Sequence, residues 1–523
     1  MPAIKNILFI MADQLRADYL SCYGHPHIQT PAMDALAARG VRYDHAYVQA
    51  PICGPSRMSF YTGRYVASHG STYNGVPLRV GEPTMGDHLR PLGLRTALVG
   101  KTHMAADAEG IRRLGLDTAS EAAIFAAQCG FEPFERDDGL WPDRPGSYDI
   151  AYNDYLRAQG YEGDNPWHTA ANSVRGDDGE VLSGWEMRHA GRPAIVAEEH
   201  SETAYMTDRA MDFIDAAGDQ PWCLHLSYIK PHWPYIAPAP YHDMYGPDDV
   251  IPANRDASER DDPHPVYAAF MGHEESGNFA REEVRRTVIP AYMGLIRQFD
   301  DHIGRLFAFL EDRGLAQHTM IVVTSDHGDY LGDHWLGEKQ LFHEESARVP
   351  LIVYDPRPEA DATRGTVDSA LVEAIDLVPT FVEAAGGTVP GHILEGRSLV
   401  GRLHGETGPW RDAVFSELDF GFRKARLDVG TEPWASRGVM LRTERWKYIE
   451  YGDLPPQLFD LETDPQERTD LGRSDDHAAI RADLHERLFR WLRDRRMRIT
   501  TSDAEVEART DRHKAAGIPY GVW

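Results

Sequence analysis

The strongest constraint on the fold is a series of short apolar runs that recur along the chain. The first, residues 7–11, contains no polar side chain, which is typical of a parallel strand covered on both faces. Similar runs occupy residues 95–100, 222–228, 320–325 and 350–354. Helical patterns lie between or after them, as at 303–310 and 377–385. This alternation predicts an α/β fold in which helices sandwich a large, mostly parallel or mixed sheet.

The character of the sequence changes near residue 400. Short strand patterns with turn signals between them occupy residues 438–443, 446–451 and 457–461. A helix follows, with Ile480, Leu484 and Leu488 on one face. We therefore expect a main α/β domain over residues 1–400 and a smaller C-terminal α+β subdomain, an antiparallel sheet plus a helix, over 401–498.

Two segments lack clear periodicity. Residues 130–193 are rich in Asp, Gly, Pro and Trp, so we expect ordered loops that cover the main domain or shape a substrate pocket or a subunit contact. Residues 499–523 form a polar tail of a kind that is usually disordered. Because this tail ends in Trp523, it is also a candidate oligomerisation arm, and we expect a homo-oligomer, either a dimer or a tetramer.

Composition limits the partners. The chain has 54 Lys and Arg against 82 Asp and Glu, a formal charge of −28, which argues against nucleic acid and anionic membranes as partners. Any anion site must be a local cluster of cations inside this acidic shell. Four cysteines in 523 residues do not form a disulfide scaffold, and the run at 7–11 is too short to span a membrane. We expect a cytoplasmic protein.

Side chains that suit a metal ion follow two of the apolar runs directly. Asp13 and Gln14 come after the first run, and Asp326 and His327 come after the run at 320–325. In an open α/β sheet, sites assemble at the carboxyl ends of the strands. Two carboxylates, an amide oxygen and an imidazole suit a single divalent cation. Either pair alone also fits a strand-end turn, so their joint occurrence carries the prediction.

A third cluster begins at Cys53, which is followed by Gly-Pro-Ser and Arg57. Pro55 and Gly63 bracket a short helix, which places Cys53 at its N-terminus, where free backbone N–H groups favour anions. Arg57 lies about one turn further on. Asn74 follows nearby and either donates to a substrate oxygen or serves as a turn residue. The alternative for Cys53 is a buried thiol without chemistry.

Cationic side chains follow the other strands. Lys101 and His103 come after the run at 95–100, and Lys230 and His232 come after the run at 222–228. Lys339 lies a short distance beyond Asp326 and His327. Each of these alone is an ordinary loop residue, but together they would neutralise a bound anion.

The Cys-x-Pro-Ser-Arg motif at Cys53, the Gly-Lys-x-His element that ends at His103 and the Asp-His pair together resemble the formylglycine-dependent sulfatase family of the alkaline-phosphatase superfamily. The resemblance runs in order from residue 13 to 339 and continues at 457–465. It implies an alkaline-phosphatase-like catalytic domain over 1–400. It also implies that a formylglycine-generating enzyme oxidises Cys53 to formylglycine, an aldehyde whose hydrate attacks sulfate esters.

The metal pairs depart from the family pattern. Most sulfatases have a second Asp in place of Gln14, and many have Asn in place of His327. Exchanging a carboxylate for an amide and gaining a nitrogen shifts the preference from Ca²⁺ toward Mn²⁺. The Asp-Gln and Asp-His pairing resembles that of the related phosphonate monoester hydrolases.

The resemblance also implies roles in a mechanism. The metal, held by Asp13, Gln14, Asp326 and His327, polarises a sulfuryl oxygen and activates the hydroxyl derived from Cys53. The transferring group is stabilised by Lys101, Lys339 and Arg57. His232 or Lys339 protonates the leaving oxygen. The hydrate has a second hydroxyl, and its deprotonation, with His103 as candidate base, expels sulfate and regenerates the aldehyde.

Three functions remain in competition. The favoured one is hydrolysis of sulfate monoesters, and the Trp-rich loops point to aryl sulfates. The second is hydrolysis of phosphonate monoesters or phosphodiesters at the same site, with cross-activity on both substrates. Related hydrolases of that kind tend to carry uncharged groups where this chain has Lys101 and His103, which favours the sulfatase. The third is a non-catalytic metal and anion-binding protein in which Cys53 stays a thiol.

Overall fold

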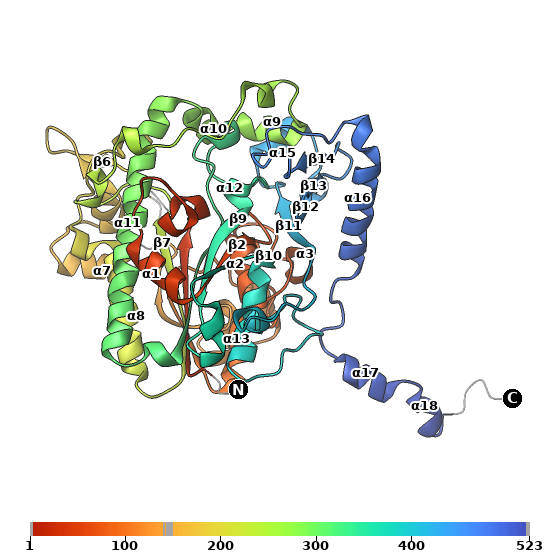
Figure 1. The fold of residues 1–523 in the computed structure, drawn as a ribbon. Helices are drawn as coiled ribbons and strands as arrows, with labels where there is room; N and C mark the ends of the chain where they lie inside the picture. Colours follow the sequence, from red (N-terminus) through yellow and green to blue (C-terminus); the bar gives the residue numbers. More distant parts are fainter. Residues whose placement is uncertain (1–3, 140–141, 143–149, 519–523) are drawn as a thin grey trace.

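A large mixed sheet forms the centre of the molecule in the computed structural model, which describes residues 4–139, 142 and 150–518 (Figure 1). Its strands are, in order across the sheet, β10 (Thr366–Glu373), β2 (Val41–Tyr47), β9 (Arg348–Tyr354), β8 (Thr319–Ser325), β1 (Asn6–Asp13), β7 (Trp222–Pro231), β3 (Arg95–Gly100) and β4 (Glu132–Arg136). Strand β9 runs antiparallel to both of its neighbours, and the other paired strands are parallel. The predicted α/β fold is confirmed.

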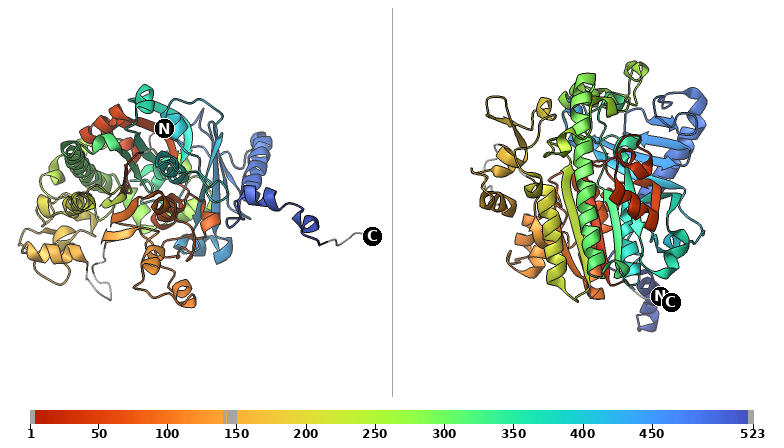
Figure 2. Two further views of the ribbon diagram at one scale, coloured as in Figure 1. Left: turned by 90° about the horizontal axis from the view of Figure 1, so that it is seen from below. Right: turned by 60° about the vertical axis from the view of Figure 1, so that its left-hand side comes forward.

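Both faces of the sheet are covered, as the apolar runs indicated. In β1, Leu8 and Ile10 pack into one core, while Ile7 and Phe9 pack into the other. The first core is covered by α1 (Pro31–Arg39), α8 (Glu202–Ala217) and α11 (Glu282–Asp312). The second core is covered by α2 (Cys53–Thr62), α4 (Met85–Leu89) and α13 (Leu377–Ala384). Figure 2 shows the long α11 helix lying along the sheet.

A second, antiparallel sheet lies beside the first (Figure 1). Its strands are β11 (Ala413–Asp419), β12 (Arg437–Thr443), β13 (Trp446–Glu450) and β14 (Gln457–Asp460). Helix α16 (Ala478–Arg493) packs Leu484, Leu488 and Trp491 against this sheet. These elements lie within the predicted subdomain at 401–498. Shorter helices are α3 (Val66–His69), α5 (Ala108–Arg113), α6 (Glu121–Ala127), α9 (Pro265–Met271), α10 (Glu274–Phe279), α12 (Glu344–Ala347), α14 (Val400–Leu403) and α15 (Lys424–Val429).

The segment at 130–193 has more regular structure than we expected. It contributes β4 to the large sheet, and it also contains α7 (Ala151–Ala158) and a hairpin of β5 (Ser173–Arg175) and β6 (Val181–Ser183). The prediction of loops alone was wrong here. Short elements carry too few residues to reveal a period, and the apolar contacts of Tyr152 and Leu156 in α7 are made with distant parts of the chain.

The C-terminal tail projects from the molecule. Helices α17 (Asp503–Arg509) and α18 (Arg512–Ala515) extend away from the main body (Figures 1 and 2). Residues 519–523, including Trp523, lie outside the described residues. Among the described residues, no helix is long and apolar enough to cross a membrane.

Candidate active site

Four neighbouring parallel strands deliver the predicted groups to one edge of the sheet. Their order is β8, β1, β7 and β3, and all four point the same way. Asp13 is the last residue of β1, and Asp326 directly follows β8. Lys101 follows β3, and His232 follows β7. The sheet therefore brings together residues that lie more than three hundred positions apart in the sequence.

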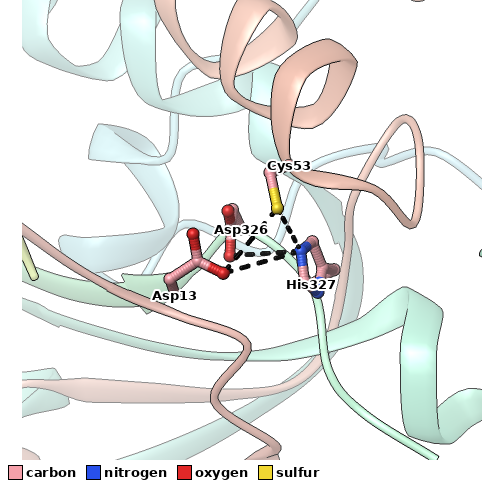
Figure 3. A group of neighbouring side chains, drawn as sticks. All are labelled: Asp13, Cys53, Asp326 and His327. Atoms are coloured by element: carbon pink, nitrogen blue, oxygen red, sulfur yellow. Dashed lines mark hydrogen bonds and ion pairs between the residues drawn. The ribbon is translucent and has the colours of Figure 1, made fainter. Parts of the chain in front are cut away.

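The centre of the site is a buried cluster of Asp13, Cys53, Asp326 and His327. One ligand atom from each lies within 4.8 Å of the others (Figure 3). The His327 Nε2 atom is 3.1 Å from the Cys53 sulfur and 3.8 Å and 3.7 Å from the nearer oxygens of Asp13 and Asp326. Such a set of oxygen and nitrogen atoms is suited to a divalent metal ion.

Arg57 lies behind this cluster and orients its two carboxylates. Its Nη2 donates to Asp13 Oδ2 at 3.0 Å, and its Nε donates to Asp326 Oδ2 at 2.7 Å. Its Nη1 donates to the Lys101 carbonyl oxygen and to the Ser227 hydroxyl. Arg57 is fully buried, and these four donor contacts all go to protein acceptors. Both Oδ1 atoms are left to face the cluster.

Hydrogen bonds also orient the other two candidate metal ligands, His327 and Gln14. His327 Nδ1 lies 2.9 Å from the Gly328 carbonyl oxygen, so Nδ1 donates to that oxygen and Nε2 faces Asp13 and Asp326. Gln14 has a left-handed backbone, with φ 66°, and its N–H donates to Asp326 Oδ1. The donor set therefore fits a bound cation, with Asp13, Gln14, Asp326 and His327 as the residues that would hold it.

Cys53 begins α2, as predicted. The next backbone N–H, that of Gly54, donates to Asn74 Oδ1 at 2.7 Å, so Asn74 caps the helix start while also lining the pocket. Burial opposes ionisation of the thiol, but the Lys339 and Lys101 cations, with smaller contributions from His327 and His103, lower the pKa of Cys53 well below its usual value. Position 53 therefore favours a negatively charged group.

Two lysines flank the cluster. Lys101 Nζ lies 2.6 Å from Asp13 Oδ2. Lys339 Nζ donates to Gln14 Oε1 at 2.7 Å and lies 3.0 Å from His232 Nε2. Both lysines are almost fully buried and both line the pocket. The structure thus gathers two cations within an otherwise acidic protein.

The histidines differ in their surroundings. His232 Nδ1 is 2.7 Å from the Trp233 carbonyl oxygen, and burial together with the Lys339 cation lowers the pKa of His232 to about 3. His232 is therefore neutral, and its Nε2 accepts a hydrogen bond from the Lys339 ammonium. His103 lines the same pocket, and the Asp138 carboxylate accepts a hydrogen bond from its backbone N–H at 2.8 Å. Lys230, by contrast, donates to Asn172 and to the Pro234 carbonyl oxygen and lies outside the pocket lining.

A pocket of about 670 Å³ opens above Cys53. Aromatic side chains line much of it, namely Tyr73, Trp167, Trp185 and Trp233. Trp167 and Trp185 come from the segment at 130–193, which supports the expectation that this segment shapes a pocket. Arg423, from the C-terminal sheet region, completes the lining next to Glu338.

Sequence reasoning missed several residues of the site. Asp329 and Tyr235 contact the Gln14 side chain, and Ser227 contacts Arg57. Asp138 holds the loop that carries His103. Only Asp329 had a local signal, because it lies two residues after His327 at the same strand end. The others are separated from their partners by tens to hundreds of residues.

The geometry agrees with the comparisons with known proteins. Residues 5–387 match the model of the sulfatase family, and residues 332–494 match that of the N-sulphoglucosamine sulphohydrolase C-terminal region. The chain belongs to the sulfatase family, within the alkaline phosphatase superfamily.

Its relatives include both kinds of hydrolase that the sequence suggested. A multifunctional alkaline phosphatase superfamily protein of Trinickia caryophylli is 30% identical, with 93% of this chain and 95% of the relative covered. An arylsulfatase of Clostridium perfringens is 28% identical, with 90% and 91% covered. The structure of a phosphonate monoester hydrolase from Silicibacter pomeroyi has a TM-score of 0.83 at 30% identity, with 95% of this chain and 97% of that chain covered.

Proposed function

We propose that this protein hydrolyses sulfate monoesters, preferably aryl sulfates, with a formylglycine derived from Cys53 and one divalent metal ion, Mn²⁺ or Ca²⁺. The observation that carries the proposal is a pair of buried lysines, Lys101 and Lys339. They lie beside the buried cluster of Asp13, Cys53, Asp326 and His327. A sulfate monoester presents three terminal oxygens to its site, and buried cations stabilise the charge that shifts onto them.

Each residue of the site has its own role in the proposed reaction. When bound, the metal ion supplies a Lewis acid for a sulfuryl oxygen. Attack by the hydroxyl at position 53 on sulfur breaks the sulfur–oxygen ester bond, and Lys101 stabilises the group in transfer. Because His232 is neutral and accepts from Lys339, the Lys339 ammonium is the proton donor to the leaving oxygen. His103 is the base that takes a proton from the second hydroxyl, and the carbon–oxygen bond to the sulfate group then breaks, which releases sulfate and re-forms the aldehyde.

The pocket supports an aromatic leaving group. Trp185 and Trp233 meet edge to face with ring centroids 5.1 Å apart, and Tyr73 stacks on Phe422 at 4.7 Å. Aromatic walls of this kind contribute favourable ring contacts to a bound aryl group. The cytoplasmic location, and modification by a formylglycine-generating enzyme, remain predictions of the sequence.

A second candidate is hydrolysis of phosphonate monoesters or phosphodiesters. Gln14 and His327 favour it, and so does the similarity to solved phosphonate monoester hydrolases, including one from Agrobacterium radiobacter with a TM-score of 0.79 at 28% identity. Cross-activity is expected because each substrate offers a tetrahedral anion.

Relative kcat/KM values test the choice. With modified protein and added Mn²⁺ or Ca²⁺, we expect an aryl sulfate to have a higher kcat/KM than a phenylphosphonate ester or a phosphodiester. Lys101→Met should lower kcat for the sulfate by about 100-fold, and by less for the diester, which has fewer charged oxygens to stabilise. Peptide mass analysis across residue 53 checks the modification.

Lys230→Met is the matched control. It removes another buried lysine at a strand end, but one whose bonds go to Asn172 and Pro234, so it should leave the substrate ratio unchanged. A reversed wild-type ratio would move the assignment to the second candidate. Unmodified Cys53 in protein from its native host would rule out both hydrolases as described.

A further inference from the structure

The side-chain amide of Gln14 is held at both ends. Its Oε1 accepts a hydrogen bond from Lys339 Nζ at 2.7 Å. Its Nε2 donates to the Asp329 carboxylate and, at 3.3 Å, to the Tyr235 hydroxyl oxygen. Gln14 and Asp329 are fully buried and Tyr235 is nearly so, which means that water does not compete for these bonds.

The partners allow only one orientation of this amide. A carboxylate such as Asp329 only accepts hydrogen bonds, and an ammonium such as Lys339 only donates them. A flipped Gln14 would place its oxygen against a carboxylate and its NH₂ against an ammonium. In the observed orientation every donor meets an acceptor, and the oxygen faces Lys339, which lines the pocket beside Cys53.

Asp329 is itself fixed. The Tyr235 hydroxyl donates to Asp329 Oδ2 at 2.6 Å, and the Leu331 backbone N–H donates to Oδ1 at 3.1 Å. The Tyr292 hydroxyl holds the Gln14 main chain by donating to its carbonyl oxygen at 2.7 Å. Hydrogen bonds therefore fix Asp329 as well as the Gln14 amide that it contacts.

We propose that Asp329 and Tyr235 are positioning residues that hold the Gln14 amide so that Oε1, and not Nε2, faces the metal site. The inference rests on the metal site of the proposed function. An amide oxygen is a ligand for a hard divalent cation, whereas an amide NH₂ group is not. Orientation of this one side chain therefore decides whether the cation has a fourth protein ligand.

Asp329→Asn tests the role of the carboxylate. If the new amide turns its oxygen toward Gln14, its NH₂ group meets the Leu331 N–H, and the two donors conflict. If it turns its NH₂ group toward Gln14, the Gln14 amide must flip. We expect the Kd for Mn²⁺, measured by calorimetry on the full chain without substrate, to rise by about 10- to 100-fold.

The exchange Gln14→Glu with Asp329→Asn should restore binding. The amide introduced at position 329 then donates to the carboxylate introduced at position 14 and accepts from the Leu331 N–H, while Tyr235 donates to that carboxylate. The single variant Gln14→Glu places two carboxylates face to face. We expect the double variant to bind Mn²⁺ more tightly than either single variant. The added ligand charge would contribute the same amount to binding in the single and the double variant, so a non-additive gain reports the restored hydrogen bond between positions 14 and 329. Tyr235→Phe keeps the carboxylate acceptor and should weaken binding less than Asp329→Asn.

Melting temperatures in chelator report on folding independently of the metal. The positioning role is overturned if Asp329→Asn binds Mn²⁺ as tightly as the wild type does. It is also overturned if the double variant does not bind Mn²⁺ more tightly than each single variant. If the wild-type chain binds neither Mn²⁺ nor Ca²⁺, the metal site of the proposed function fails, and the positioning role fails with it. If the wild type binds metal but the variants do not differ from it, only the positioning role fails.

Discussion

At the scale of the residue, the most constrained side chain is Arg57. It lies between two buried carboxylates, Asp13 and Asp326, and is itself inaccessible to solvent. Two carboxylates this close repel each other when both are ionised, so the guanidinium stabilises the pair before any metal binds. The planar fork of arginine suits this task because it contacts both carboxylates and two further oxygens at once.

Arg57→Met should destabilise the metal-free protein. Removing the cation leaves two buried carboxylates without a partner, and we expect the free energy of unfolding in chelator to fall by about 3–5 kcal/mol. Arg57→Lys keeps the charge but not the planar fork, so its free energy of unfolding should lie between those of the wild type and Arg57→Met. Urea denaturation measures both variants.

The control is Arg39→Met, which breaks the exposed pair of Arg39 and Glu311. A surface pair of this kind contributes up to about 1 kcal/mol. Equal losses in the Arg57 and Arg39 variants would show that the buried contacts of Arg57 contribute nothing special to stability.

At the scale of the element, the segment from 326 to 343 runs from the end of β8 to the start of α12 and carries Lys339. His334 anchors it. Its Nδ1 lies 2.6 Å from Glu259 Oε1, its Nε2 lies 3.3 Å from Glu345 Oε2, and its ring stacks on His343 at 4.0 Å. Burial opposes the charge, but the Glu345 and Glu259 carboxylates raise the pKa of His334 to about 10.

This anchor should weaken in alkali. A pKa raised above the unfolded value of about 6.5 means that the stabilisation is fully present below pH 6.5 and is lost as the pH rises through about 10. We expect the difference in unfolding free energy between wild type and His334→Gln to shrink over that range. His485→Gln, which breaks an exposed pair with Glu450, is the control and should change stability little. A difference that stays constant from pH 6.5 to 10 would contradict a charged His334.

Elements were predictable where their local pattern was strong. The runs that became β1, β3, β7 and β8 are apolar throughout because both faces of the sheet are covered. Strand β2 was missed because it mixes charged and apolar residues. The antiparallel direction of β9 could not be predicted, because strand direction depends on which neighbours pair and not on the residues of the strand itself.

At the scale of the whole molecule, helices α17 and α18 project from the body. No residue of α17 is buried, and both tail helices point away from the body. Met497 and Ile518, which flank the tail helices, are exposed apolar side chains. A second copy of the chain is the partner that we propose for this arm, in a dimer or a tetramer.

Truncation after Arg498 should lower the mass in solution, measured by light scattering after size-exclusion chromatography, to that of a smaller assembly. Because α17 has no buried residue, Mn²⁺ affinity and the circular dichroism of the body should stay unchanged, which serves as the control. An unchanged mass would show that the tail does not contribute to the assembly.

Local patterns in the sequence were enough to predict the class of fold and to nominate the residues of the candidate site. Cys53 with its Pro-Ser-Arg, and the polar pairs at the ends of apolar runs, are local signals, since each lies within a few residues of the strand or helix that positions it. The tertiary structure alone decided how these groups serve one another. Arg57 reaches Asp326 across 269 positions and Gln14 reaches Tyr235 across 221, and contacts at such separations depend on how the whole sheet is ordered. That ordering places the Arg57 guanidinium against the carboxylates of Asp13 and Asp326.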